Sequence, residues 1–367
     1  MYIHELTKWP NFAWDYESLA PLLGEVRNKQ GQLYGRMTAL GFEQCKAAVL
    51  ECLTSEVVET SQIEGEVLNP EQVRSSIARR LGIESASIQV DRNVEGVVDM
   101  VVDATQNHLQ PLTRKRLLSW HAALFPTGHS GLRKIVVANY RDATVDPMEV
   151  VSGPIGREKV HFTAPSGTRV PAEMEQFLHW FETAPNLDLV LKAGVAHLWF
   201  VTIHPFEDGN GRIARALADM MLSRSEKSAL RFYSMSAQIK AEDEEYYGML
   251  ERTQKASLDI TPWLRWFLEC LGRAIDAAQT TVDASLFRAR FWQSVSHLSL
   301  NDRQRKVLDL VLDNFEGKLT SSKWARLTKC SNDTALRDIN QLIEFEILTK
   351  DPSGGRSASY SLKVDPR

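Results

Sequence analysis

Apolar side chains recur at intervals of three and four residues through most of this 367-residue chain. The first series runs from Leu19 to Leu40, and a similar pattern continues over 42–58. Such spacing places the apolar residues on one face of a helix, and helices of this kind pack face to face. Asn69-Pro70 would begin another helix, because proline is favoured at the first helical position. A mainly α fold is predicted, with further helices over 73–81, 94–104, 113–124, 172–181, 187–203, 212–223 and 261–275.

One stretch, between Gly128 and Pro171, interrupts the helical pattern. Glycine, proline and serine separate short β-branched runs at 135–137, 150–151 and 159–162. This alternation of turn residues with strand formers is typical of hairpins. We expect one or two β-hairpins here.

The segment 299–367 follows a different order of elements. Helical patterns give way to two short strand-like runs around Gly354-Gly355. That order matches a winged helix-turn-helix, with 321–327 as the supporting helix, 331–339 as the second helix and 348–362 as the wing. A polar helical connector over 276–298 would precede it.

Composition is that of a globular protein of two or three domains, since 43% of the residues are hydrophobic and 25% are charged. The net charge of -4 gives no global electrostatic reason to bind nucleic acid or an anionic membrane. The four cysteines include no C-x-x-C pair, so neither a zinc site nor a disulfide framework is indicated. The N-terminus lacks a basic region followed by an apolar stretch, and no apolar run could span a bilayer. A cytoplasmic location is the expectation.

The segment 204–215, HPFEDGNGRIAR, lies between two predicted helices and forms a loop that opens the second. Gly209 and Gly211 let the backbone approach a ligand, so that N–H groups and the positive end of the helix can cradle phosphate. Arg212 and Arg215 lie three apart on that helix and can both bind phosphate oxygens. No P-loop sequence occurs in the chain, so phosphate chemistry would use this segment.

Two further side chains of the segment can supply reactive groups. Asp208 offers an ionised oxygen to Mg²⁺, which needs only one or two protein carboxylates when phosphates complete its shell. His204 titrates near neutrality and can accept a proton from an attacking hydroxyl. Base, metal ligand, anion cradle and arginine clamp are together what a phosphoryl-type displacement requires.

The segment resembles the active-site motif of the Fic (filamentation induced by cAMP) family, H-P-F-x-[DE]-G-N-G-R-x-x-R, and every fixed position is filled. His197-Leu-Trp-Phe before it and Asp259-Ile-Thr-Pro-Trp-Leu after it also look like this family. The resemblance implies a Fic-type helical bundle with a β-hairpin flap, an N-terminal helical extension and a C-terminal winged helix-turn-helix. The implied divisions are an N-terminal region 1–110, a catalytic domain 111–275, the connector 276–298 and the winged helix 299–367.

The resemblance also implies a role for each residue of the motif and a reaction, the transfer of AMP from Mg-ATP to a Ser, Thr or Tyr hydroxyl of a target protein. The roles are His204 as general base, Asp208 as magnesium ligand, Asn210 with the amides of Gly209 and Gly211 as phosphate ligands, Arg212 for the triphosphate and Arg215 for its γ end. Doc-like kinases of the family typically depart from the glycine pair, so AMP transfer is favoured here over phosphate transfer. A phosphotransferase is the alternative within this class, and phosphocholine transfer is less favoured than either.

The segment from Thr60 to Gly65 resembles the family's inhibitory signature, [ST]-x-x-x-E-[GN], although alone it would be an ordinary polar helix end closed by glycine. By this resemblance Glu64 pairs with Arg215 and occupies the guanidinium that would otherwise hold the γ-phosphate. A charge-assisted contact of this kind can misplace the triphosphate. We expect a self-inhibited enzyme, and the resemblance leaves open both self-modification and removal of AMP.

Substrate contacts are expected outside the motif as well. The strand-rich segment around Val150, Val151 and Ser152 lies where the family has its flap, which aligns the target's backbone by main-chain pairing. An ordinary surface hairpin is the alternative. Tyr246, Tyr247 and Gln254 match the family's adenine-side residues, since aromatic faces suit base stacking, but one of the tyrosines could equally pack in the core.

The main rival is a DNA-binding transcription regulator or adaptor that uses the Fic-like region as a sensor. Its recognition helix would present Asn332, Thr334 and Arg337 to bases, yet Asp333 and Asp338 share that helix. A DNA-binding surface usually has a clearer basic stripe. A protein-docking or dimerisation module, compatible with a homodimer, is therefore favoured over nucleic-acid binding.

Overall fold

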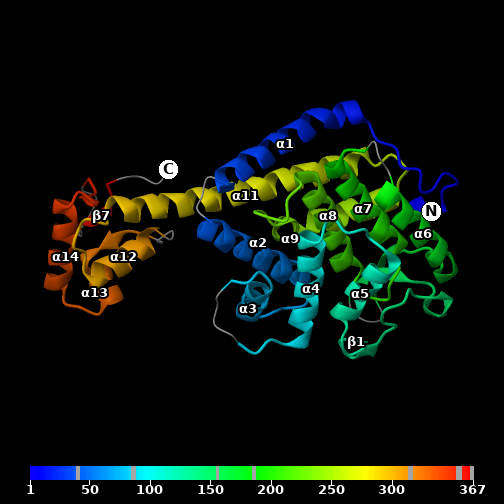
Figure 1. The fold of residues 1–367 in the computed structure, drawn as a ribbon, viewed down its shortest axis with the longest axis horizontal. Coiled ribbons are helices and arrows are strands. Elements are labelled where there is room, and N and C mark those ends of the chain that lie inside the picture. The colour runs from blue at the N-terminus through cyan, green and yellow to red at the C-terminus, as the bar shows by residue number, and fades with distance from the viewer. Residues whose placement is uncertain are drawn as a thin grey trace. The chain divides into compact units, whose positions relative to one another are not determined.

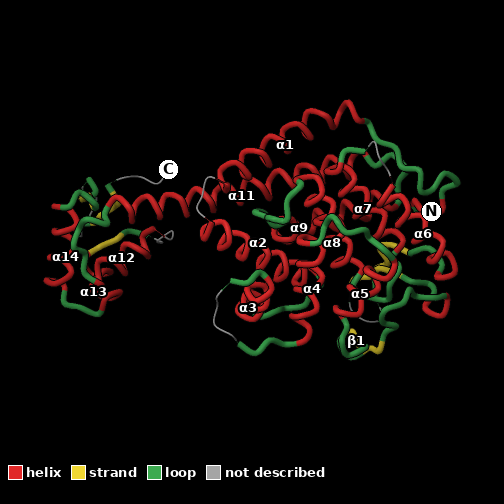
Figure 2. The backbone as a smooth tube through the Cα atoms, in the orientation of Figure 1, coloured by secondary structure: helices red, strands yellow, loops and turns green. Residues whose placement is uncertain are grey.

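The computed structural model describes residues 1–38, 42–83, 88–153, 157–183, 187–312, 317–352 and 358–363. The chain divides into two compact units, Met1–Ala278 and Gln279–Arg367. Helices dominate both units, and the strands are short (Figure 1; Figure 2). The predicted mainly α class is confirmed. No helix in the described part of the chain is long and apolar enough to cross a membrane.

Two central helices, α7 (Leu189–Ile203) and α8 (Asn210–Glu226), organise the first unit. They pack against each other, and Figure 1 shows the other helices arranged around them. Every residue from Val190 to Ile203 is buried, as expected for a helix that is apolar on all sides. The surrounding helices are α1 (Tyr16–Thr38), α2 (Phe42–Ile63), α3 (Pro70–Arg80), α4 (Arg92–Gln106), α5 (Arg114–Leu124), α6 (Val170–Thr183), α9 (Met235–Ala241), α10 (Asp243–Gln254) and the first part of α11 (Thr261–Ser294).

Helix starts follow the local sequence closely. At α3, Pro70 takes the first helical position, and the Asn69 side chain accepts hydrogen bonds from the backbone N–H groups of Glu71 and Gln72. These bonds satisfy donors that a helix N-terminus otherwise leaves unpaired. The helix start predicted at Asn69-Pro70 is confirmed.

The region predicted to hold hairpins contains two of them. The first pairs β1 (His129–Ser130) with β2 (Arg133–Lys134), and the second pairs β3 (Glu149–Ser152) with β4 (Lys159–Thr163), both antiparallel. The strand expected at 135–137 is wrong. There the backbone N–H of Val136 donates to the Glu207 carboxylate at 3.2 Å, so a side chain takes the place of a strand partner.

The second unit combines the end of α11 with α12 (Asp302–Leu312), α13 (Ser321–Thr328), α14 (Asn332–Glu344) and a small antiparallel sheet. The sheet has the order β5-β7-β6, from Leu319–Thr320, Ser359–Leu362 and Leu348–Lys350. Its core gathers around Trp324, which is fully buried, with Val307, Ile339 and Leu342. Gly354-Gly355 lies outside the described residues, and the winged helix-turn-helix assignment stays a prediction.

Asp338, one of the two acidic residues on the expected recognition helix, does not face solvent. Asp338 is buried, and its carboxylate accepts hydrogen bonds from Arg303 at 2.7 Å and Asn301 at 3.0 Å. Burial tends to raise the pKa of this carboxyl, but the bonds to Arg303 and Asn301 outweigh it and leave the pKa lowered. Asp338 therefore fastens α14 to α12 instead of adding negative charge to an exposed helix face.

Candidate active site

The loop between α7 and α8 is shaped by two residues in left-handed conformations. His204 ends α7 with φ +52° and Gly209 caps α8 with φ +83°. A Cβ at Gly209 would also lie only 2.9 Å from the Phe125 ring, so glycine is required there for two reasons. The buried Asn210 side chain closes the loop, because it accepts from the N–H of Phe206 and donates to its carbonyl. A direct contact between Asn210 and phosphate stays a prediction.

His204 is held as a neutral imidazole. Burial lowers its pKa to about 4, and the positive charge of Arg141 acts in the same direction. Nδ1 lies 3.3 Å from the carbonyl oxygen of Val201, which favours the proton on Nδ1 and leaves Nε2 as the acceptor. A neutral imidazole with a free acceptor nitrogen is the form that a general base requires.

The backbone of His204 is fixed by a residue distant in sequence. Arg141 is buried and donates from Nε to the His204 carbonyl at 2.7 Å. Its other nitrogens reach the Pro165 carbonyl at 2.6 Å and the Asp146 carboxylate at 3.0 Å. Arg141 thereby joins the active-site loop to the segments that flank the β3–β4 hairpin.

Asp208 is tied to the neighbouring hairpin. One carboxylate oxygen accepts a hydrogen bond at 2.5 Å from the backbone N–H of Gly209, the residue that caps α8. The other oxygen accepts a hydrogen bond from the Ser130 hydroxyl of β1. His121 contacts the Asp208 carbonyl through Nε2 at 3.2 Å and stacks on Phe206 with ring centroids 4.0 Å apart. Burial lowers the pKa of His121 to about 4, so its contacts are those of a neutral ring.

Among the described residues, no group of three or more His, Cys, Asp or Glu side chains could hold a metal by itself. Mg²⁺ takes few protein carboxylates and completes its shell with phosphates and water, so it does not require such a group. The role of Asp208 as a magnesium ligand stays a prediction.

Two buried arginines of α8 meet the segment that follows α2. Arg215, 2% exposed, donates to the Thr60 hydroxyl at 2.7 Å, to the Thr60 carbonyl at 2.9 Å and to Glu64 Oε1 at 2.7 Å. Arg212, 6% exposed, donates from Nη1 to Glu66 Oε2 at 2.6 Å. Each guanidinium is therefore paired with a carboxylate of the same short segment.

Glu64 reaches Arg215 across the start of α8. A Cβ on Gly211 would lie 2.1 Å from Glu64 Oε1 and 3.2 Å from Arg215 Nη1. Any larger residue at 211 would have to displace the carboxylate. Gly211 thus opens the space beside the helix N-terminus in which Glu64 now sits and in which an anion would be attracted.

The three residues predicted on the adenine side differ in their surroundings. Tyr246 is buried with its hydroxyl 2.9 Å from His197 Nε2, and Gln254 is buried with Nε2 3.3 Å from the Thr202 hydroxyl. Tyr247 is 44% exposed and donates to the Ile63 carbonyl at 3.1 Å. Of the three, only Tyr247 is exposed, and base contact by all three stays a prediction.

The predicted flap residues lie on β3, whose partner is β4. Val150 pairs with Phe162, and Val151 is 47% exposed. Ser152 Oγ lies 2.6 Å from His161 Nε2, and His161 Nδ1 lies 2.7 Å from Glu251 Oε2 on α10. A hydrogen-bonded chain therefore ties the hairpin to α10.

Residues 111–222 match the family model described as Fic/DOC family, and residues 2–83 match one described as a domain of unknown function, DUF4172. The chain is thus similar to the Fic family over residues 111–222. Curated relatives are named protein adenylyltransferase Fic. That of Drosophila virilis is 26% identical over 262 residues, covering 69% of this chain and 47% of the relative, and that of Drosophila grimshawi is 28% identical over 222 residues, covering 58% and 40%. The chain thus spans less than half the length of these relatives.

Solved Fic structures share the fold. A Fic family protein from Desulfovibrio desulfuricans G20 aligns with a TM-score of 0.52 at 21% identity, over 93% of this chain and 96% of that one. A Fic domain-containing signaling protein from Bacteroides thetaiotaomicron VPI-5482 aligns with a TM-score of 0.51 at 22% identity, over 69% and 97%. At these identities the likeness establishes the architecture alone.

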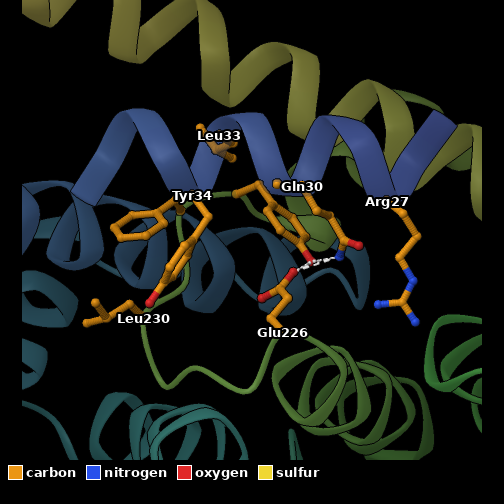
Figure 3. A pocket seen from close by; sticks show the side chains of 9 residues that line it. Arg27, Gln30, Leu33, Tyr34, Glu226 and Leu230 are labelled. Carbon is orange, nitrogen blue, oxygen red and sulfur yellow. Dashed lines mark hydrogen bonds between the residues drawn. The ribbon is translucent and has the colours of Figure 1, made fainter. Parts of the chain in front are cut away.

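A separate cavity lies at the other end of α8 from the Fic motif (Figure 3). It has a volume of about 210 Å³ and lies between α1 and the segment that follows α8. Gln30 donates to Glu226 Oε1 at 2.7 Å and to the Tyr233 hydroxyl at 3.2 Å, which joins the cavity's polar side chains to one another. With α8 running 17 residues, this cavity is about 24 Å along the helix from the active-site loop.

Sequence reasoning missed several residues that shape the Fic site. They are His121, Ser130, Arg141, His161 and Glu66. The first four are distant from the motif in sequence, and nothing in their local pattern marks them. Glu66 follows Glu64 by two positions in the sequence, but the direction of its side chain depends on the turn at Gly65.

Proposed function

We propose that this protein transfers AMP from ATP to a hydroxyl of a protein substrate. The observation that carries the proposal is the complete motif loop, in which a neutral His204 with a free Nε2 stands beside two arginines at a helix N-terminus. The curated relatives named protein adenylyltransferase Fic support it.

The residues divide the reaction between them. Arg212, Arg215 and the N–H groups at the start of α8 hold the phosphates. The substrate hydroxyl oxygen attacks the α-phosphorus, the bond from that phosphorus to the bridging oxygen breaks, and diphosphate leaves. His204 Nε2 takes the hydroxyl proton. Mg²⁺ held through Asp208 would neutralise charge on the phosphates.

The two glycines of the loop favour transfer of AMP over transfer of phosphate. Both Gly209 and Gly211 are present, and each lies where a side chain would collide with a neighbour. The backbone can therefore approach the nucleotide closely enough to place the α-phosphorus in line with the hydroxyl. In a phosphotransferase the γ-phosphorus would take that place instead.

We also propose that Glu64 inhibits the enzyme. Its contact with Arg215 occupies a guanidinium that the terminal phosphate needs, and its carboxylate lies against Gly211, where negative charge would repel a phosphate. The inhibition requires no unfolding, because displacing one carboxylate frees the arginine.

The experiment uses wild type, Glu64→Gly and His204→Ala with Mg²⁺ and ATP labelled at either the α or the γ position. Transfer of the α label to protein by Glu64→Gly, weaker transfer by wild type and none by His204→Ala is the expected result. Protein mass measurement identifies the adduct. Transfer of the γ label alone would replace the proposal with a phosphotransferase, and transfer of neither label would refute it.

A further inference from the structure

The segment Thr60–Glu66 brings two carboxylates to α8, and they engage different arginines. Glu64 Oε1 lies 2.7 Å from Arg215 Nη2, and Glu66 Oε2 lies 2.6 Å from Arg212 Nη1. Both arginines belong to the motif that would hold the triphosphate. The proposed inhibition by Glu64 accounts for the first pair and leaves the second unexplained.

The position of Glu66 follows from the way α2 ends. The N–H of Glu66 donates to the Ser61 carbonyl and the N–H of Gly65 donates to the Gln62 carbonyl, both at 3.0 Å, with Gly65 at φ +78°. These are the bonds of a Schellman motif, which reverses the chain at a helix C-terminus and requires a left-handed residue. Because the chain reverses here instead of continuing along the axis of α2, Glu66 lies against α8.

A second contact holds the same turn in place. The Tyr247 hydroxyl of α10 donates to the Ile63 carbonyl, one residue before Glu64, at 3.1 Å. That carbonyl is among those that a helix C-terminus leaves without an intrahelical partner. The turn is therefore anchored from α10 as well as from α8.

Arg212 retains binding capacity that Glu66 does not use. Its Nε is buried and has no hydrogen-bond partner among the described residues. A buried, unpaired donor on a charged group is costly, and such a group is expected to meet an acceptor in its working state. Phosphate oxygens supply acceptors in the planar, two-pronged arrangement that a guanidinium matches.

We infer that Glu66 is a second inhibitory residue, which occupies Arg212 while Glu64 occupies Arg215. The inference rests on the proposed function, since it takes these arginines as the triphosphate ligands. With two carboxylates in place, an incoming triphosphate must break two charge-assisted contacts and displace two negative charges. Because one turn carries both residues, releasing that turn frees both arginines together.

Binding of α,β-methylene ATP, which cannot transfer AMP, tests the inference without relying on turnover. Calorimetric titration of the full chain compares wild type, Glu66→Gln, Glu64→Gly and the double variant. Glu71→Gln is the matched control, because it removes the same charge from an exposed residue for which the described structure shows no ion pair. Glu66→Asp keeps the charge on a side chain one methylene shorter.

Glu66→Gln is expected to bind the analogue about tenfold more tightly than wild type, a change of about 1.4 kcal/mol. The double variant should bind the analogue more tightly than either single variant, because it removes both carboxylates from the arginines. Glu66→Asp should fall between wild type and Glu66→Gln, and Glu71→Gln should match wild type. Thermal unfolding checks that each variant is folded.

Equal or weaker binding by Glu66→Gln than by Glu71→Gln overturns the inference, because Glu66 then merely positions Arg212. The failure of the proposed function has a different signature. If Glu66→Gln tightens analogue binding but no variant transfers an α-labelled AMP group, the second inhibitory contact stands and the adenylyltransferase reaction does not.

Discussion

Replacing Glu64 by glutamine should destabilise the nucleotide-free chain while improving its response to nucleotide. Removing one partner of a fully buried ion pair costs about 3–5 kcal/mol, because the other charge is left buried and unpaired. Here Glu64 is 28% exposed, and Arg215 keeps two hydrogen bonds to Thr60. Solvent and Thr60 offset part of the loss, so we expect a cost of about 1–2 kcal/mol.

Thermal unfolding with and without α,β-methylene ATP measures both effects. A cost of this size lowers the midpoint of a large domain by roughly 2–6 °C, and the transition to follow is the one that the analogue shifts. The analogue should then raise the midpoint of Glu64→Gln by more than that of wild type, since its phosphates replace the missing carboxylate on Arg215. An unchanged midpoint in the nucleotide-free variant would refute the reasoning, because Arg215 would then not depend on Glu64 for its pairing.

Three other outcomes are expected. Since burial holds the pKa of His204 at about 4, AMP transfer by Glu64→Gly should persist as pH falls below 6.5 and decline only as the imidazole gains a proton near 4; a pH–rate profile with a midpoint near 6.5 would contradict this. Gly211→Ala would place a Cβ 2.1 Å from Glu64 Oε1, so it should displace the carboxylate but also narrow the cradle, and calorimetry should show analogue binding at least about tenfold weaker than for Glu64→Gly. His161→Ala removes the link between β3 and α10, so steady-state kinetics should show a higher KM for protein substrate while analogue affinity stays unchanged; a matching loss of analogue affinity would assign His161 to the nucleotide site instead.

The helical architecture was predictable because it depends on periodicity and on local helix-start signals. Neighbouring residues alone determine both the apolar run that forms α7 and the start of α3 at Asn69-Pro70. The strand expected at 135–137 failed for the opposite reason. Three β-branched residues in a row favour a strand, but the N–H of Val136 donates to the Glu207 side chain. Glu207 is distant in sequence, so no local pattern could indicate that contact.

The site was predictable to the extent that it is one continuous segment. His204 to Arg215 lie together because a single loop carries them. The side chains that hold this segment in shape come from elsewhere, as Arg141 does at the His204 carbonyl and Ser130 at the Asp208 carboxylate. The depressed pKa of His204 likewise depends on burial by the assembled fold, so the sequence could indicate a base but not its neutral state.

Release of the two arginines should occur at the turn that follows α2 and not by movement of the whole helix. One turn before Thr60, Glu56 is buried and accepts hydrogen bonds from the Ser234 hydroxyl at 2.6 Å and from the Ser236 N–H at 3.0 Å. Shifting α2 would break these buried bonds, each of which costs more to leave unmade than a bond exposed to water. Glu64 and Glu66 lie beyond the last helical residue and are 28% and 34% exposed, so water can solvate them as they leave. The least costly route to an open site is therefore a change in the turn at Gly65, which would free both arginines while α2 stays packed.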